Sequence, residues 1–117
     1  LLESVVNETV PLEQSAFAAL SLGLVFIGKS NETVSNTIVE SLIKRSNNKK
    51  EQLDSHWSRI FGIGLALVFM GAQNKSDAIL KEINKINHPI KKWIEIMTES
   101  IAYIGSGNVL KVQKMSN

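Results

Sequence analysis

One apolar pattern occurs three times along this chain, and each copy closes on a glycine that is followed three residues later by an asparagine. The copies are AALSLGLVFIGKSN, FGIGLALVFMGAQN and TESIAYIGSGN. Their closing glycines, Gly28, Gly71 and Gly105, are 43 and 34 residues apart. Repeats of this length are typical of solenoids built from two-helix units. The repeat therefore predicts an all-α fold, an α-solenoid of helical hairpins.

Small residues also recur at matched positions inside each copy. A single glycine within a helix would simply cost about 1 kcal/mol relative to alanine. Recurrence favours a different reason, in which small residues let the backbones of neighbouring inner helices approach closely. The two matched sets are Gly23, Ala66 and Ser100, and Ser21, Gly64 and Thr98.

The pattern also predicts where the helices begin and end. Each closing glycine can adopt the left-handed conformation that ends a helix at its C′ position. The asparagine three residues later can cap the next helix or form a turn. We expect inner helices that close at Gly28 and Gly71 and a third from Ile90 to about Ile104. The expected repeats are 12–46, 54–86 and 90–117, and 1–10 is expected to end an earlier outer helix.

Between the apolar segments the sequence predicts outer helices, each with one solvent-exposed face. Val34, Ile38 and Leu42 recur at four-residue steps, which predicts an amphipathic helix over 32–46. The second outer helix is expected after Asn74, with a cap at Ser76 or Asp77, and another is expected from Val109. We expect 47–52 to be an exposed loop and Asp54 or Ser55 to cap the following helix. The residues placed on the wet face of the first outer helix are Glu32, Asn36, Glu40, Lys44 and Arg45.

Composition argues against several classes of protein. The net charge of +2 and the scattered lysines give little support to nucleic-acid binding. Cysteine is absent, so a disulfide framework, a thiolate metal site and a cysteine nucleophile are all excluded. The longest apolar stretches, 16–28 and 60–72, are shorter than the ~20 residues that cross a bilayer. Because the chain starts at Leu1 and shows no targeting pattern, we interpret it as a piece of a longer protein.

No arrangement in the sequence indicates catalysis, a metal site or a cofactor. His56 and His88 have no metal-ligand partner three or four residues away. Glu95 and Glu99 share a helix face with preceding lysines, which favours a solvated ion-pair face over an acid pair. Trp57 and Trp93 are interpreted as packing residues at the junctions between repeats. Protein binding on the outer helices is therefore the expected function.

The segments AALSLGLVFIG, FGIGLALVFMG and IAYIGSGNVLKVQ resemble proteasome/cyclosome repeats over essentially the whole chain. The segment HWSR at 56–59 and the turn NHP at 87–89 are most similar to the smaller of the two repeat-bearing scaffold subunits of the proteasome regulatory particle. This resemblance implies a non-catalytic arc of a larger toroid, located with the proteasome in the cytoplasm and nucleus. The implied partners are ubiquitin, ubiquitin-like domains of shuttle factors and other proteasome base subunits.

The resemblance also implies a docking surface of acidic residues on the first outer helix. By position these fall on Thr33, Glu40 and Lys44, of which only Glu40 is acidic, and Glu32 can stand in for the acid missing at Thr33. A reversed charge at Lys44 should weaken docking. Two alternatives stay open: a structural arc that braces neighbouring subunits, and an ordinary solvated helix face. The candidate ubiquitin-binding residues are Glu32, Thr33, Asn36, Glu40, Lys44 and Asp77.

Overall fold

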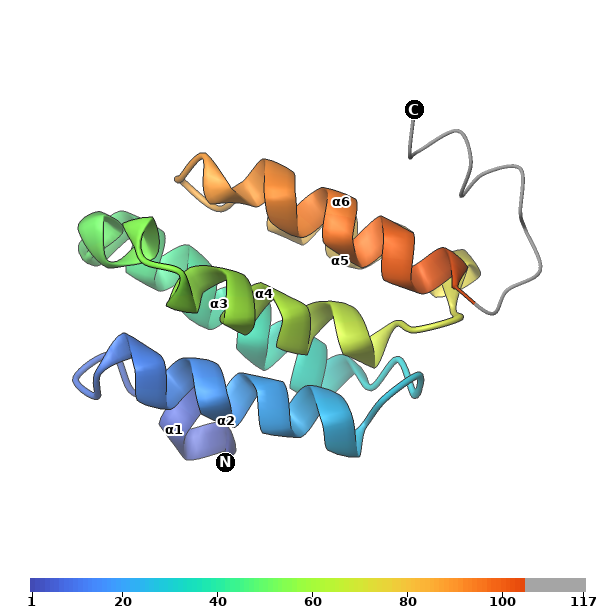
Figure 1. Ribbon diagram of the computed structural model, residues 1–117, viewed down its shortest axis with the longest axis horizontal. Helices are drawn as coiled ribbons and strands as arrows, with labels where there is room; N and C mark the ends of the chain where they lie inside the picture. Colours follow the sequence, from blue (N-terminus) through green and yellow to red (C-terminus); the bar gives the residue numbers. More distant parts are fainter. Residues whose placement is uncertain (105–117) are drawn as a thin grey trace.

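The computed structural model describes residues 1–104, and within that range every regular element is helical. Three inner helices lie side by side in chain order and form the front layer in Figure 1: α2 (Leu12–Val25), α4 (Trp57–Val68) and α6 (Ile90–Tyr103). The outer helices lie behind them: α1 (Leu2–Val6), α3 (Glu32–Asn48) and α5 (Asp77–Ile83). Short 3₁₀ helices η1 (Lys50–Asp54) and η2 (Gln73–Lys75) precede α4 and α5. This two-layer stack of helical hairpins confirms the predicted fold class.

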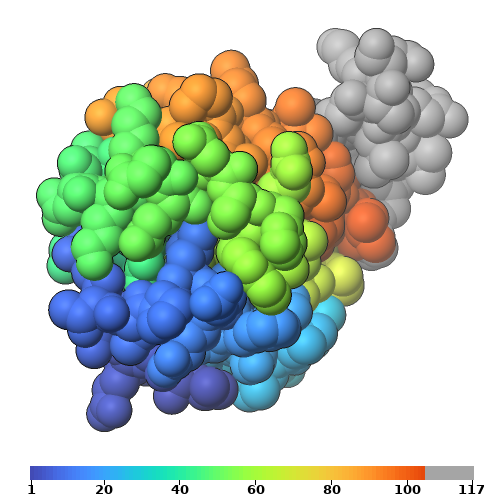
Figure 2. Space-filling model, turned by 60° about the vertical axis from the view of Figure 1, so that its left-hand side comes forward, coloured from blue at the N-terminus to red at the C-terminus, as the bar shows by residue number. Residues whose placement is uncertain are grey.

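The core lies between the two layers, because each outer helix turns one apolar stripe toward the inner row. Val34, Ile38 and Leu42 of α3 are at most 3% exposed, as their four-residue spacing predicted. Burying such a side chain contributes about 1.5–3 kcal/mol. The space-filling view in Figure 2 shows successive segments stacked in chain order from blue to orange. Each unit therefore buries its apolar face against the next one along the chain.

The backbones of α2 and α4 touch at glycine, as the recurring small residues predicted. A Cβ atom added to Gly23 would lie 2.3 Å from the carbonyl oxygen of Gly64. A Cβ atom on Gly64 would lie 2.4 Å from the carbonyl oxygen of Ala19. No side chain fits at either position without moving a helix.

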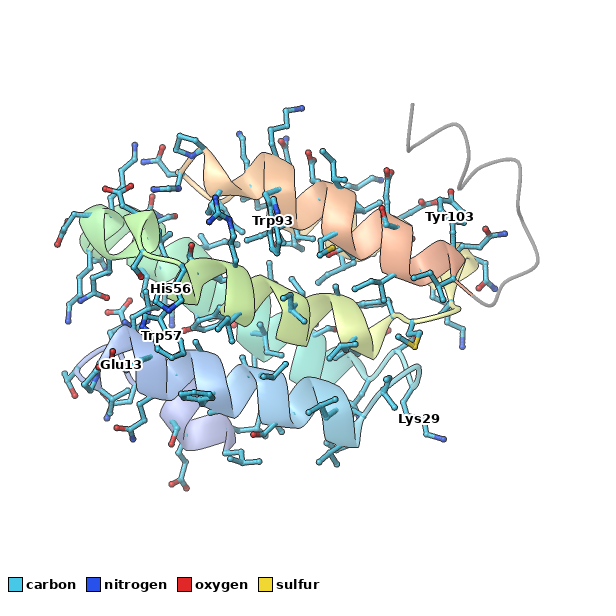
Figure 3. The ribbon with its side chains drawn as sticks, in the orientation of Figure 1. Glu13, Lys29, His56, Trp57, Trp93 and Tyr103 are labelled. Atoms are coloured by element: carbon cyan, nitrogen blue, oxygen red, sulfur yellow. The ribbon has the colours of Figure 1, made fainter. Side chains whose placement is uncertain are left out.

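Aromatic side chains pack at the junctions between inner helices, in agreement with the interpretation of the tryptophans. Trp57, at the start of α4, makes an edge-on contact with Phe17 of α2 at a centroid distance of 5.0 Å. The guanidinium carbon of Arg59 lies 5.9 Å from the centre of the Trp93 ring on α6. Figure 3 shows Trp57 between α2 and α4 and Trp93 on the side of α6 that faces α4.

The two closing glycines in the described range have the predicted left-handed backbone. The φ angles are 71° at Gly28 and 72° at Gly71, each two residues after the C-cap. The Asn31 side chain accepts a hydrogen bond of 3.0 Å from the Val34 amide and so caps α3. Asn74 does not cap α5 but lies within the 3₁₀ turn η2, so the turn is the alternative that applies at this position. The third glycine and asparagine, and the helix expected from Val109, lie outside the described residues.

Three other local predictions were wrong. The region 47–52 is mostly exposed as expected, but it is not a loop, since α3 continues to Asn48 and η1 follows, with Leu53 fully buried. Neither α4 nor α5 has a side-chain cap, and the Ser76 hydroxyl instead donates to the Gln73 carbonyl. The second outer helix ends at Ile83, before the end of the expected repeat 54–86, although Ile86 is still buried. For 47–52, the buried side chain of Leu53 holds the backbone against the core although the preceding residues are polar.

Arg45 was placed on the wet face of the first outer helix, and that placement was wrong. Its side chain is 0% exposed, although the residue is charged. It lies three residues after Leu42 and seven after Ile38, so it belongs to the apolar stripe of α3 by position. Helical periodicity determined its direction, and hydrogen-bond acceptors from neighbouring segments made its burial possible.

Candidate functional site

The first outer helix, α3, is built to present a polar face next to a fixed N-terminus. Asn31 caps it, and the Glu32 carboxylate in the first turn interacts favourably with the positive end of the helix dipole. The apolar stripe of the helix is held in the core, so the opposite stripe faces away from the inner row. Glu32, Asn36 and Glu40 are exposed on it.

A groove of about 740 Å³ lies between the N-terminal half of α3 and the segment formed by η2 and α5. Glu32 and Asn36 line it from α3, and Asp77 lines it from α5. Glu32 and Asp77 are more than 40 positions apart in the sequence. The structure therefore brings three of the six candidate residues together in one place.

The other three candidate residues do not line this groove. Glu40 and Lys44 line a separate hollow of about 50 Å³ together with Val6 of α1. Thr33 is exposed on the first turn of α3, and its carbonyl accepts a hydrogen bond of 2.6 Å from the Thr37 hydroxyl. Five of the six candidate residues thus divide between two hollows, one facing α5 and one beside α1, and Thr33 lines neither.

Carboxylates dominate the charge of the groove. Within residues 1–104, Glu32 and Asp77 form no ion pair. Glu82, at the same groove, has an ion pair of 2.9 Å with Lys85. Lys75 is the cation among the lining side chains. The groove therefore keeps two carboxylates without a cationic neighbour in contact, and it is complementary to a positively charged ligand.

The groove also has lining residues that were not predicted as site residues, among them Phe69 and Ser30. Phe69, which follows α4, is 5% exposed and contributes apolar surface at the groove. Ser30 has a φ angle of 52°, an uncommon conformation for a residue other than glycine, and its hydroxyl oxygen is buried without a hydrogen-bond partner in the described range. No sequence signal identifies Ser30, because its conformation depends on its amide donating to Val68 of α4 at 2.8 Å.

The far end of α3 is fixed by the buried guanidinium of Arg45. Its Nη2 atom donates to the carbonyls of Asn7 and Val10, both at 3.2 Å, and to the Ser15 hydroxyl at 2.9 Å. Nη1 donates to Gln52 at 2.8 Å. Burial lowers the pKa of Arg45 by removing water from the charged form, and the nearby charge of Glu8 acts in the opposite direction. Arg45 thus links the α1–α2 turn and η1 to α3.

His88 has a structural role at the start of α6. Its Nδ1 accepts a hydrogen bond of 2.9 Å from the Ile90 amide, and its Nε2 lies 2.7 Å from Asp54 Oδ1. Both ring nitrogens are therefore engaged. The His88–Asp54 contact ties the α5–α6 turn to the end of η1, and the bond of 2.9 Å from the Asn87 amide to the Ser46 hydroxyl ties it to the last turns of α3.

Two other kinds of site are absent from residues 1–104. No group of three or more histidine or acidic side chains is arranged to hold a metal ion in this range. No helix among these residues combines the length and the apolar character that a bilayer crossing requires.

Several proteins of known identity align with nearly the whole chain. It is 37% identical over 116 residues to the 26S proteasome regulatory subunit rpn1 of Schizosaccharomyces pombe, covering 98% of this chain and 13% of that subunit. It is 36% identical over 115 residues to the 26S proteasome non-ATPase regulatory subunit 2 homolog A of Arabidopsis thaliana, covering 97% of this chain and 13% of the relative. Identity to the regulatory subunit rpn2 of Schizosaccharomyces pombe is 28% over 91 residues, covering 78% of this chain and 9% of that subunit.

No protein-family model matches the chain. The chain spans about an eighth of the length of the first two relatives, so it matches one segment of them. The alignment to rpn1 is longer and has higher identity than the alignment to rpn2. The chain therefore belongs to the family of 26S proteasome regulatory subunits that includes rpn1 and non-ATPase regulatory subunit 2, as a helical-repeat segment of such a subunit.

Proposed function

We propose that this chain is a non-catalytic scaffold segment of the proteasome regulatory particle that docks ubiquitin and the ubiquitin-like domains of shuttle factors on its outer helices. In this proposal the repeats 12–46, 54–86 and 90–117 form part of a closed ring, located with the proteasome in the cytoplasm and nucleus. Other base subunits of the proteasome are its structural partners. The family to which the chain belongs supports the scaffold role.

The observation that carries the docking proposal is the groove between α3 and α5. Glu32, Asn36 and Asp77 meet there although they come from different repeats, and two of them are unpaired carboxylates within the described range. Ubiquitin offers an apolar patch with a basic rim, which such a surface complements in charge. Charge complementarity of this kind raises association rates and selects partners more than it raises affinity. We therefore expect weak, rapidly exchanging binding.

The remaining candidate residues have different expected contributions. Thr33 is uncharged, and Lys44 has the opposite sign to the acid that the resemblance implies at its position. Glu40 keeps its charge and is exposed next to the hollow beside α1. Docking is therefore expected to be weaker than it would be with acids at all three positions.

A titration of the isotope-labelled 117-residue chain with unlabelled ubiquitin tests the proposal. We expect amide resonances of residues 31–45 and of α5 to shift progressively, with little change in the inner helices. A small protein of similar size and net charge without an apolar patch provides the control. If no resonance in residues 31–45 moves at millimolar ubiquitin, the docking function is wrong.

The second candidate function is a structural arc that braces neighbouring proteasome subunits without receiving ubiquitin. The observation that favours it is the positive charge of Lys44 on an otherwise acidic stripe of α3. In that case Lys44→Glu should create ubiquitin binding that the native chain lacks. Ubiquitin binding by the native chain would exclude this alternative.

A further inference from the structure

We infer that a hollow at the starts of α4 and α6 binds a short acidic segment of a protein partner, and that the guanidinium of Arg59 receives its carboxylate. None of the six candidate residues of the outer helices lines this hollow. The inference therefore goes beyond the proposed docking of ubiquitin.

Two segments that docking on the outer helices does not use meet at this hollow, which measures about 270 Å³. Ser58 and Arg59 line it from the segment HWSR at 56–59. His88 and Pro89 line it from the turn NHP at 87–89. Figure 1 shows that α4 and α6 start at the same end of the inner row. The stacking of repeats therefore brings residues of two units to one place.

Arg59 presents its guanidinium at this hollow without an acidic partner. The guanidinium carbon lies 5.9 Å from the centre of the Trp93 ring, and Trp93 lines the same hollow. A guanidinium over an aromatic face keeps the N–H groups at its edge, which can bind both oxygens of a carboxylate. Arg59 is exposed, and within residues 1–104 it forms no ion pair. It is therefore a cation held against an aromatic ring and accessible to an anion.

The acid that lines the hollow, Asp54, is already engaged by His88. Asp54 Oδ1 lies 2.7 Å from Nε2 of His88, while Nδ1 of His88 accepts a hydrogen bond of 2.9 Å from the Ile90 amide. Because Nδ1 accepts, the proton of the neutral ring is on Nε2 and is donated to Asp54. The negative charge of Asp54 also makes the hollow better matched to a singly charged carboxylate than to a phosphate group, which carries nearly two charges.

The ends of the two helices also favour an anion. Acidic side chains stabilise the first turn of a helix, because its free N–H groups make that end positive. The first turns of α2, α3 and α5 each contain an acid, whereas those of α4 and α6 contain none. The residues there are basic instead: Arg59 in α4, and Lys91 and Lys92 in α6. A carboxylate from a partner would supply the negative charge that the chain does not place in these turns.

Apolar surface beside Arg59 indicates a protein segment as the occupant. Pro89 is exposed and Trp93 is half-buried, and both line the hollow. An acidic residue with an apolar neighbour can place its carboxylate on Arg59 and its apolar side chain against Trp93. Helical solenoids commonly bind other proteins. The occupant is therefore a short segment in which Asp or Glu adjoins an apolar residue.

Titrations of the isotope-labelled 117-residue chain with two short capped peptides test this inference. One peptide alternates glutamate and leucine, and the other has glutamine in place of each glutamate. We expect the Nε–H resonance of Arg59 and the indole N–H resonance of Trp93 to shift with the glutamate peptide and to stay in place with the glutamine peptide. Arg59→Gln should weaken binding of the glutamate peptide by about threefold to fivefold, the upper part of what an exposed ion pair provides.

Lys81→Gln is the matched control, because it removes the same charge from an exposed position on α5 that does not line the hollow. It should change the affinity for the glutamate peptide by less than about 1.5-fold. Circular dichroism of both variants checks that the fold is unchanged, since both substituted side chains are exposed.

Three results would overturn the inference. In the first, Arg59→Gln binds the glutamate peptide as tightly as the native chain does. In the second, neither resonance moves at millimolar glutamate peptide. In the third, inorganic phosphate shifts the Arg59 resonance more than the glutamate peptide does at equal concentration, so that the hollow is a phosphate site. Each of these results leaves the ubiquitin-docking function standing, because no ubiquitin is present in the titration.

Discussion

The backbone contact between α2 and α4 predicts that Gly64→Ala destabilises the chain, although alanine is the better helix former. In an isolated helix the change would stabilise by about 1 kcal/mol. Here the new Cβ would lie 2.4 Å from the Ala19 carbonyl oxygen, about 1 Å closer than the 3.4 Å at which ordinary contacts begin. That atom belongs to the backbone, so no rotamer change relieves the clash and the two helices must separate.

Forced separation of packed elements typically costs about 1–3 kcal/mol, and more when no side chain can move away. After subtraction of the helix-propensity gain, we expect a net loss of about 2 kcal/mol in the free energy of unfolding. For a chain of this size that corresponds to a fall in Tm of about 8 °C. Thermal unfolding followed by circular dichroism measures it.

Gly62→Ala in the same helix is the matched control for this prediction. Its Cβ would meet the Cγ1 atom of the fully buried Ile94 at 2.8 Å, which is a smaller overlap than at Gly64 and involves a side chain instead of a backbone carbonyl. We therefore expect Gly62→Ala to stay within about 1 kcal/mol of the native chain. If Gly64→Ala melts at or above the native temperature, the contact between the backbones of α2 and α4 does not determine the packing, and the explanation of the recurring small residues is wrong.

Two further predictions concern the buried arginine of α3 and the asparagines before the two outer helices. Arg45→Met should lower the free energy of unfolding by about 3 kcal/mol, because it leaves buried backbone carbonyls without hydrogen-bond donors. Urea titrations measure this loss. A loss under about 1 kcal/mol would show that water replaces the guanidinium. Asn31→Ala should lower the free energy of unfolding by about 1 kcal/mol, because it removes the side-chain cap of α3. Asn74→Ala, at the matched repeat position, should change the free energy of unfolding by less than about 0.5 kcal/mol, because Asn74 does not cap α5. Equal effects at the two asparagines would contradict the difference seen between the repeats.

Part of the candidate site could be predicted from the sequence. Helical periodicity correctly placed Glu32, Asn36 and Glu40 on the exposed face of α3. It could not show that Asp77 would face Glu32 and Asn36 across a groove while Glu40 would turn toward α1. Those relations depend on the distance and angle between outer helices, which the packing of the inner row determines. The ubiquitin-binding role of these residues stays a prediction.

Local errors in the sequence interpretation have a shared physical cause. Charge suggested that Arg45 would be exposed, yet its helical position and four acceptors from distant segments favoured burial. Polarity suggested an open loop over 47–52, yet the burial of Leu53 coils that segment against the core. Composition describes what a residue prefers in isolation, and partners supplied by the fold can outweigh that preference.

The sequence alone determined the helical class, the order of inner and outer helices and the two glycines with left-handed backbone just beyond the ends of α2 and α4. These features depend on short-range rules: period 3.6 in the apolar residues, and φ angles near 71° that glycine adopts without strain. Only the tertiary structure decided that Gly23 and Gly64 meet each other, that Ser30 is left with a buried hydroxyl, and that Glu32 and Asp77 share one groove. Such relations join residues tens of positions apart, and their geometry is fixed by the packing of whole helices.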